Sequence, residues 1–483
     1  MEKSFFGKFK YDGPDQADGI VYNSVKVYGW PKTIVLGLQH IVAMSGATII
    51  VPILVAGYFV GIGAKVSTAL FFAGVATLFF QLVTFAKVPI FLGSSFAFLG
   101  GYQAVANMTN GQFATLSMEE KFQYASGGVV VAGLMYLVLA LLMKLAGTKR
   151  VMKYLPPTVT GPIVVCIGAS LFGSAFDNYS QNWILATIAA ALIVIFNVRG
   201  KGIIKIIPIL MSAVISYAIA VVMHLLGFTN ADGSAIINTA AINGASLIGP
   251  PSIIKPMWEL NSTITMVVCA LPAMVEHIGD INAVSIAAKR SFTKFPGLHR
   301  TLLGDGAGTS IAGIFGGFPN TSYGENTGVV AITKNADPRG HRIAAYGAII
   351  LGCSPLISAA IGTIPTAIIG GISLALYGMI SIIGFRNLIE NKTDFMNERN
   401  LWVAVFIIAF GIGVTYRYPN GIAIPHTTIS LSGLALASII GILLNAILNV
   451  WSKSGRDLEK RNYGDDAYAD ANRGIALSSL KKD

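Results

Sequence analysis

Two short stretches of this sequence decide its fold: Val88 to Phe98 reads VPIFLGSSFAF, and Gly316 to Asn326 reads GGFPNTSYGEN. In each, a proline lies in a stretch that we expect to be extended, and small polar residues then lead towards a helix start. Both stretches interrupt long apolar sequence. Non-helical backbone at membrane depth is tolerated only where protein or a watery cavity satisfies it, and a helix start leaves free N–H groups. The pair therefore predicts a ligand site between the two stretches.

The composition around these stretches indicates an integral membrane protein. Of 483 residues, 54% are hydrophobic and only 12% are charged, about half the charged share of an ordinary soluble domain. Apolar runs of about 20 residues, the length that crosses a bilayer, recur from Thr33 to Trp451. The net charge of +11 comes from short basic clusters between apolar runs, without the interleaved aromatics of a nucleic-acid groove. We therefore expect lipid and not nucleic acid as the surroundings.

The apolar runs, bounded by Gly, Pro and charged residues, predict an all-α polytopic protein with fourteen transmembrane segments. The third and tenth are too short and too broken to be ordinary spanning helices. The predicted segments are 33–57, 66–86, 89–107, 123–147, 155–177, 181–198, 203–227, 259–287, 299–316, 319–333, 341–363, 365–388, 400–416 and 427–451.

The distribution of basic residues tests this count, because loops on the cytoplasmic side carry an excess of Lys and Arg. With the amino terminus in the cytoplasm, the outer loops hold few basic residues and the inner loops hold most of them. This agreement favours an even number of segments and places both termini in the cytoplasm. The inner loops contain Lys87, Lys149, Arg150, Lys153, Arg199, Lys201, Lys205, Lys289, Arg290, Lys294, Arg300, Lys334, Arg339, Arg342, Arg386, Lys392 and Arg399.

Two segments seven apart resemble each other. Leu155 to Gly173 reads LPPTVTGPIVVCIGASLFG, and Ile364 to Gly378 reads IPTAIIGGISLALYG, each with a Gly five residues after a Pro. A repeat of seven segments reverses its direction through the membrane, as in secondary transporters whose sites lie where broken helices meet. A chance match of membrane Pro and Gly is the alternative interpretation.

Ionisable residues inside the predicted segments are few, and each costs at least about 2.5–3.5 kcal/mol at the bilayer centre, so each needs a partner or a function. In LPAMVEHIGDINAVS, Glu276 and Asp280 are four residues apart and share a helix face. Glu276 could instead make a packing hydrogen bond as a protonated acid, and Asp280 could fix nearby backbone. His277 is expected to pack or to bond a carbonyl rather than to contact ligand.

A third acid, Glu325, follows Gly324 at a helix start, where the partial positive charge of the helix end stabilises a carboxylate. Helix capping alone is the alternative. His40, preceded by Gln39, is either a core histidine or a hydrogen-bond partner of Glu325 that tunes its proton occupancy.

Phe96 and Tyr323 lie at the two junctions between extended stretch and helix, so they predict an aromatic wall beside the acids, although ordinary packing is possible for each. Acids, free N–H groups and an aromatic wall suit a small, flat, neutral molecule with both donors and acceptors. The three cysteines, Cys166, Cys269 and Cys353, are too far apart for a metal motif and are expected to pack in the core. We expect no metal and no cofactor.

At these residues the sequence resembles the nucleobase/ascorbate transporter family. Its signature of an acid or Gln, Asn, any residue, Gly, four residues, Thr and a basic or small residue matches ENTGVVAITK, from Glu325 to Lys334. The motifs LQH, GATIIVP, LGSSFAF, EHIG and PNTSYGENTGVVAIT, in this order along both halves, are most similar to the bacterial uracil permease branch.

The resemblance implies two inverted seven-segment repeats, arranged as a core domain of segments 1–4 and 8–11 and a gate domain of segments 5–7 and 12–14, with a homodimer formed through the gate domains. It also implies a multi-pass protein of the bacterial inner membrane. The implied divisions are a cytoplasmic segment 1–32, core parts 33–147 and 259–363, gate parts 148–227 and 364–451, an extracellular loop 228–258, and a cytoplasmic tail 452–483.

The resemblance further implies elevator-like, proton-coupled uracil import. Glu276 would bond the uracil ring, Glu325 with the Gly324 and Phe96 backbone would bond its other polar edge, and Phe96 and Tyr323 would flank it. His40 would hold Glu325, and protons would be carried among His40, Glu325 and Glu276. Asp280, Gln39 and Asn326 would lie around this site or at an ion site.

Asp280 departs from the pattern, because some uracil-type members have a histidine there. Two acids on one face leave room for sodium, so a purine symporter coupled to protons or sodium stays open. An anion transporter of the same fold should prefer a neutral or positive pocket, against which Glu276 and Glu325 argue. The sequence has no HExxH motif, nucleophile triad or phosphate loop, so an enzyme is not expected.

Overall fold

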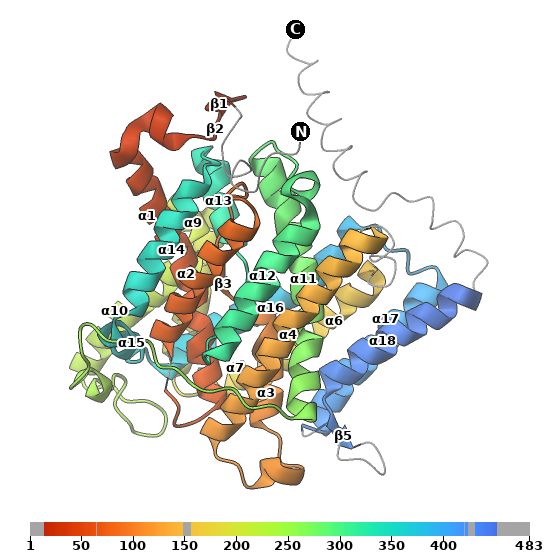
Figure 1. The fold of residues 1–483 in the computed structure, drawn as a ribbon. Helices are drawn as coiled ribbons and strands as arrows, with labels where there is room; N and C mark the ends of the chain where they lie inside the picture. Colours follow the sequence, from red (N-terminus) through yellow and green to blue (C-terminus); the bar gives the residue numbers. More distant parts are fainter. Residues whose placement is uncertain (1–13, 64, 148–155, 420, 424–429, 452–483) are drawn as a thin grey trace.

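The computed structural model describes residues 14–63, 65–147, 156–419, 421–423 and 430–451. The predicted cytoplasmic tail 452–483, the first thirteen residues of the predicted amino-terminal segment and the start of the Leu155–Gly173 repeat lie outside the described residues. Helices dominate the described chain (Figure 1).

The first half contains a series of apolar helices interrupted once by a short strand. Its elements are β1 (Gln16–Ala17), β2 (Ile20–Val21), α1 (Ser24–Tyr58), α2 (Val66–Val83), β3 (Leu92–Ser94), a 3-10 helix (Phe96–Phe98), α3 (Leu99–Ala106), α4 (Met118–Ala146), α6 (Pro157–Ser170), α7 (Phe172–Tyr179), α8 (Trp183–Arg199), α9 (Ile203–Ile206) and α10 (Pro208–Leu225).

The second half repeats this pattern, with its strand again just before a short helix. Its elements are α11 (Leu260–Ala287), α12 (Leu298–Ile314), β4 (Asn320–Ser322), α13 (Gly324–Thr333), α14 (Pro338–Gly352), α15 (Pro355–Ile361), α16 (Thr366–Glu390), α17 (Glu398–Arg417), β5 (Ile422–Ala423), β6 (Ser430–Leu431) and α18 (Gly433–Trp451).

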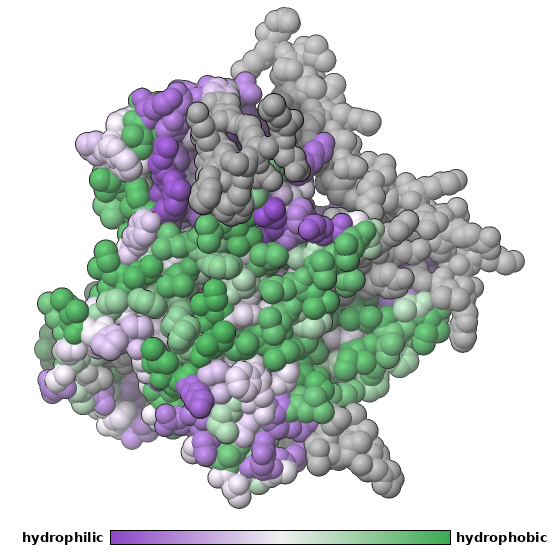
Figure 2. Space-filling view, viewed as in Figure 1, coloured by the Kyte–Doolittle hydropathy of each residue, from purple (hydrophilic) through white to green (hydrophobic). Residues whose placement is uncertain are grey.

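Eight helices in the described chain are long and apolar enough to cross a membrane, and α14 with α15, bent by 84°, makes a ninth. The sequence predicted fourteen segments. The difference arises because several predicted segments contain a helix shorter than the roughly 20 residues that cross a bilayer. The helices α3 and α13 are short and follow strands, and α8 and α12 each have 17 residues. Figure 2 shows a broad apolar band across the face in view, with polar residues above and below it, as expected for a protein surrounded by lipid.

The two interrupted stretches meet in the interior as an antiparallel pair of strands. Leu92 of β3 pairs with Ser322 of β4, and Ser94 pairs with Asn320. One threonine holds the start of each strand: the Thr77 hydroxyl bonds both the N–H (2.9 Å) and the carbonyl (3.1 Å) of Leu92. Each strand is extended and leads into a helix start, as the sequence predicted.

In the second half, Thr309 of α12 bonds the N–H and the carbonyl of Asn320 in the same way, each at 3.1 Å. Both threonines are buried. Because backbone polar groups at membrane depth must be satisfied within the protein, these bonds make the short strands possible there.

Close glycine contacts set the helix packing. α4, α11 and α12 lie side by side (Figure 1), and a Cβ at Gly133 of α4 would lie 2.5 Å from the Gly306 carbonyl of α12. α6 and α16 cross equally closely, where a Cβ at Gly384 would lie 2.6 Å from the Gly161 carbonyl. Small residues that let helix backbones approach are typical of membrane interfaces.

The chain just before α1 is bound to the ends of two distant helices. Val21 of β2 exchanges backbone hydrogen bonds of 2.8 Å with Lys334 and Ala336, just after α13. The Tyr22 hydroxyl donates to the Ala288 carbonyl, just after α11 (2.8 Å). We call residues 15–24 the clasp, because they connect the ends of α11 and α13.

Candidate functional site

The start of α13 carries the first acidic group of the site. Tyr323 is the N-cap of α13, and Glu325 lies in the first turn, where the helix dipole favours a negative charge. Glu325 is half-buried and Gly324 is exposed. Open space adjoins Gly324: the nearest heavy atom that a Cβ there would meet is Asp280 Oδ1, at 3.9 Å.

α11 contributes the other two acids, on one face as predicted. The Ser322 hydroxyl donates to Asp280 Oδ2 (2.6 Å), which ties α11 to β4 and leaves Asp280 Oδ1 beside Gly324. Glu276 lies one turn earlier on α11, which packs against α13, the helix that carries Glu325. The structure therefore brings Glu276, Asp280 and Glu325 together.

An accessible strip along α11 reaches this cluster from one end. Every residue from Asn261 to Val275 is buried or half-buried, whereas Glu276, Gly279 and Ala283 are exposed. These three residues follow one another at helical spacing towards the carboxyl end of α11. The acid cluster is thus open towards the end of the molecule where the clasp lies.

His40 contacts Asn326 rather than Glu325. Its Nδ1 lies 3.2 Å from Asn326 Nδ2, which also donates to the His40 carbonyl (3.1 Å). On its other side the His40 ring lies against His341, with ring centroids 4.0 Å apart. No hydrogen bond joins His40 to Glu325 among the described residues, and the role of His40 in holding Glu325 stays a prediction. Side chains at 325 and 326 point about 100° apart on a helix, and the buried one faces α1.

The two predicted aromatic residues have different environments. Tyr323 is buried: its ring lies over Gly93, where any Cβ would clash with it, and its hydroxyl donates to the Ser94 carbonyl (3.0 Å). The Thr48 hydroxyl in turn lies 3.1 Å from the Tyr323 hydroxyl. Tyr323 therefore joins α1, β3 and β4, whereas Phe96 is half-buried at the start of its 3-10 helix. Gln39 is half-buried on α1.

Sequence reasoning missed Asp305, in the middle of α12. Its Oδ2 lies 2.9 Å from Nδ1 of His277, and both side chains are fully buried. The Phe80 ring lies nearly perpendicular to the ring of this histidine, with ring centroids 6.2 Å apart. The sequence feature that could have identified Asp305 is its position as an acid between two glycines within the predicted segment 299–316. His277, expected to pack or to bond a carbonyl, instead pairs with a carboxylate directly behind Glu276.

The cluster is acidic throughout. In the described part of the chain, none of Glu276, Asp280 and Glu325 forms an ion pair with Lys or Arg. That part also contains no group of three His, Cys, Asp or Glu side chains arranged to hold a metal ion. Acceptor oxygens beside the free N–H groups of a helix start can bond a neutral molecule that has both donors and acceptors.

A membrane-embedded fold with broken helices around polar residues defines a polytopic membrane transporter. A model of the permease family, named for xanthine and uracil permeases, matches residues 31–419. The chain therefore belongs to this permease family, whose members are transporters and not enzymes.

Curated relatives cover most of the chain. A probable uracil permease of Pasteurella multocida is 35% identical over 86% of this chain and 94% of its own. The uracil permease of Bacillus caldolyticus is also 35% identical, over 89% and 95%. That of Escherichia coli K12 is 33% identical, over 87% and 92%.

Solved structures of more distant proteins share the fold. The transmembrane domain of a cyanobacterial bicarbonate transporter, BicA, aligns with a TM-score of 0.53 at 16% identity, covering 86% of this chain and 98% of its own. The murine anion transporter Slc26a9 in its inward-facing state aligns with a TM-score of 0.60 at 12% identity, covering 92% and 73%. At these identities the likeness concerns the fold alone.

Proposed function

We propose that this protein imports a nucleobase, with uracil as the main substrate, by proton symport. One observation carries the proposal: the accessible Glu276 lies on α11, which packs against the start of α13 that holds Glu325, and neither acid is paired with a basic side chain in the described chain. Uracil presents two N–H donors and two carbonyl acceptors, which match carboxylate oxygens and free backbone N–H groups. The relatives that carry the name uracil permease support this substrate.

An acidic site favours a neutral substrate over an anion. A carboxylate cluster without a cation repels bicarbonate or sulfate, and burying a further negative charge there would be costly. The fold shared with anion transporters is compatible with this, because one fold hosts sites of different chemistry. In our proposal a proton bound by Glu276 or Glu325 neutralises that carboxylate, which lowers the cost of carrying the loaded site across hydrocarbon and couples substrate movement to the proton.

Equivalent contacts in the two halves support fourteen segments in two inverted repeats. α4 packs on α11 as α14 packs on α1, and α12 packs on α4 as α2 packs on α14. The bonds of Thr77 to Leu92 and of Thr309 to Asn320 repeat the same relation at the strands.

The same packing supports a core and a gate. α1–α4 pack mainly with α11–α14, and α6–α10 mainly with α16–α18. In our proposal the first group carries the substrate past the second in an elevator-like motion, and two copies associate through their gates.

The accessible strip on α11 supports an inward-open state. Basic residues cluster in the loops at this end, which by the positive-inside rule is cytoplasmic. Both termini would then lie in the cytoplasm, and the site would release substrate inward.

Uptake into proteoliposomes tests the proposal. With the inside alkaline, radiolabelled uracil should accumulate, unlabelled uracil should compete, and xanthine, hypoxanthine and adenine should compete poorly. A proton ionophore should abolish accumulation. The Glu276→Gln variant should lose uptake while keeping the wild-type elution profile, and Glu119→Gln, an exposed acid on α4, should behave as wild type.

The competing assignments give other results. Competition by purines would move the substrate to that class, and uptake that needs sodium would replace the proton and direct attention to Asp280. Absence of nucleobase transport by correctly folded protein would overturn the proposal and favour an anion substrate.

A further inference from the structure

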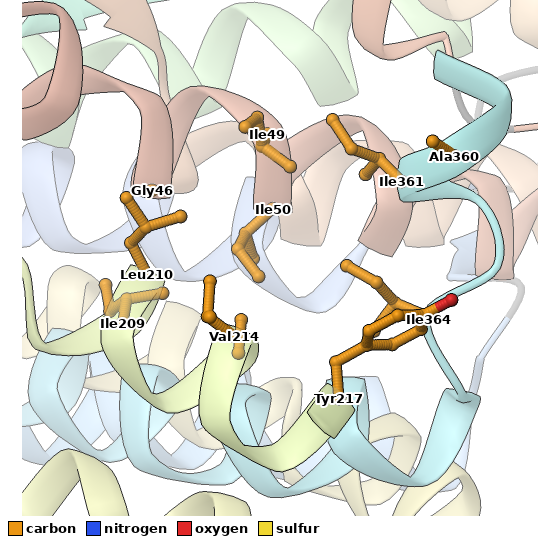
Figure 3. A pocket seen from close by; sticks show the side chains of 11 residues that line it. Gly46, Ile49, Ile50, Ile209, Leu210, Val214, Tyr217, Ala360, Ile361 and Ile364 are labelled. Atoms are coloured by element: carbon orange, nitrogen blue, oxygen red, sulfur yellow. The ribbon is translucent and has the colours of Figure 1, made fainter. Parts of the chain in front are cut away.

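A separate cavity of about 270 Å³ lies between α1, α10 and the end of α15 (Figure 3). Gly46 and Ile50 of α1 form one wall, Leu210 and Val214 of α10 form the opposite wall, and Ile361 lies at one end. None of the three acids of the candidate site lines it. The cavity lies where the first packing group of helices meets the second.

The chemistry of the lining excludes a polar occupant. Of the described residues that line the cavity, only Tyr217 has a polar side chain, and its hydroxyl is bonded to the Thr363 hydroxyl at 2.7 Å. The volume would hold roughly nine waters at about 30 Å³ each, but a buried water needs about 2–4 polar partners, and apolar cavities instead take apolar ligands. The occupant must therefore be hydrocarbon.

The open side of the cavity lies at an exposed, apolar part of the surface. Val214 is 57% exposed and Ala360 is also exposed, and α10 is one of the helices apolar enough to span the membrane. Acyl chains are the hydrocarbon at this depth, and each buried methylene favours insertion into an apolar site.

We propose that this cavity is a binding site for one acyl chain of a bilayer phospholipid, which enters past Val214 and Ala360 and fills the space between Ile50 and Leu210. The acyl chain makes apolar contacts with both walls and so bridges the two groups of helices. This site is independent of the transported substrate, so its test does not depend on the uptake experiment.

Photolabelling of the full-length protein tests the proposal. Purified protein is reconstituted in liposomes that contain phosphatidylcholine with a diazirine in the middle of one acyl chain, irradiated, and mapped by peptide mass spectrometry. Ile50 and Ile350 provide the contrast, because Ile50 is 3% exposed and lines the cavity, whereas Ile350 is 71% exposed on α14. A chain in the cavity labels Ile50 as well as Ile350. Labelling of Ile350 without Ile50 overturns the proposal.

A matched pair of variants on α1 separates the cavity from the outer surface. At Gly46 a Cβ meets Leu210 at ordinary contact distances of 3.6 Å or more, so Gly46→Leu is chosen to fill the cavity, whereas Gly57 adjoins open space. Gly46→Leu should lose the Ile50 adduct and keep the Ile350 adduct, and Gly57→Leu should keep both. Ala360→Leu fills the cavity from the other helix and replaces Gly46→Leu if that variant fails to fold. An Ile50 adduct that survives the filling variant also overturns the proposal.

Discussion

The two broken stretches of this protein share a backbone and differ in side chains. In each, a buried threonine holds the first residue of a short strand, and the chain then turns into a helix start. Counted from those threonine contacts, Ala97 in the first stretch stands where Glu325 stands in the second. The two stretches thus have similar supports, and Glu325 in the second has an alanine at the corresponding place in the first. The backbone arrangement is common to the two stretches, whereas the acidic side chain is found in the second stretch alone.

The largest expected effect comes from removing the acid that distinguishes the second stretch. Glu325→Gln keeps the shape but removes the charge, and hydrogen bonds to charged groups contribute about 1.5–3 kcal/mol, or roughly 10- to 150-fold in affinity. Uracil binding by calorimetry should weaken accordingly. Ala97→Ser, at the equivalent place in the first stretch, should weaken it far less. Equal losses in the two variants would contradict the assignment of chemistry to one half.

The next effect concerns the shared support. Thr77→Val and Thr309→Val each remove two hydrogen bonds from buried backbone groups, which costs about 1–3 kcal/mol for each unsatisfied group. Thermal unfolding in detergent should show similar losses of stability in the two variants. Only Thr309→Val should also weaken uracil binding, because its strand leads to Glu325. A stability loss confined to one variant would show that the two supports are not equivalent.

The sequence predicted much of this arrangement because the deciding residues are adjacent along the chain. Extended stretch, small polar residues and helix start follow one another in GGFPNTSYGEN, and the i, i+4 spacing of Glu276 and Asp280 fixes their common face on α11. Contacts between segments far apart in the sequence could not be predicted in the same way. Helix direction places Asn326 rather than Glu325 against His40, and turns Tyr323 onto Gly93 and away from the open space. The pairing of His277 with Asp305 needs the crossing of α11 and α12, which no local pattern encodes.

A smaller effect is expected at the bond between α11 and β4. Ser322→Ala removes the donor to Asp280 Oδ2, a bond of 2.6 Å, and leaves the carboxylate to find water or an ion. Uracil affinity should fall by less than for Glu325→Gln, because Ser322→Ala keeps all three acids and changes only the hydrogen bonding of Asp280, which lies next to Gly324. Ser310→Ala, which removes a comparable hydroxyl bond between α12 and α4, is the control for lost packing. Uptake by wild type and by Ser322→Ala, each measured with and without sodium, tests the coupling. Sodium dependence in wild type would favour sodium as the coupling ion.

The smallest effect concerns the clasp, which connects the ends of the two helices that carry the acids. Tyr22→Phe removes only the hydroxyl that donates to the Ala288 carbonyl, a loss of about 0.5–1.5 kcal/mol. Because the Val21 backbone bonds to Lys334 and Ala336 remain, stability should fall slightly while the end of α11 opens more often. Hydrogen exchange should therefore accelerate around Ala288 and stay unchanged around Leu260, at the opposite end of α11. Faster exchange at both ends would mean that the hydroxyl supports the whole helix, whereas no change at Ala288 would show that the hydroxyl does not hold the end of α11.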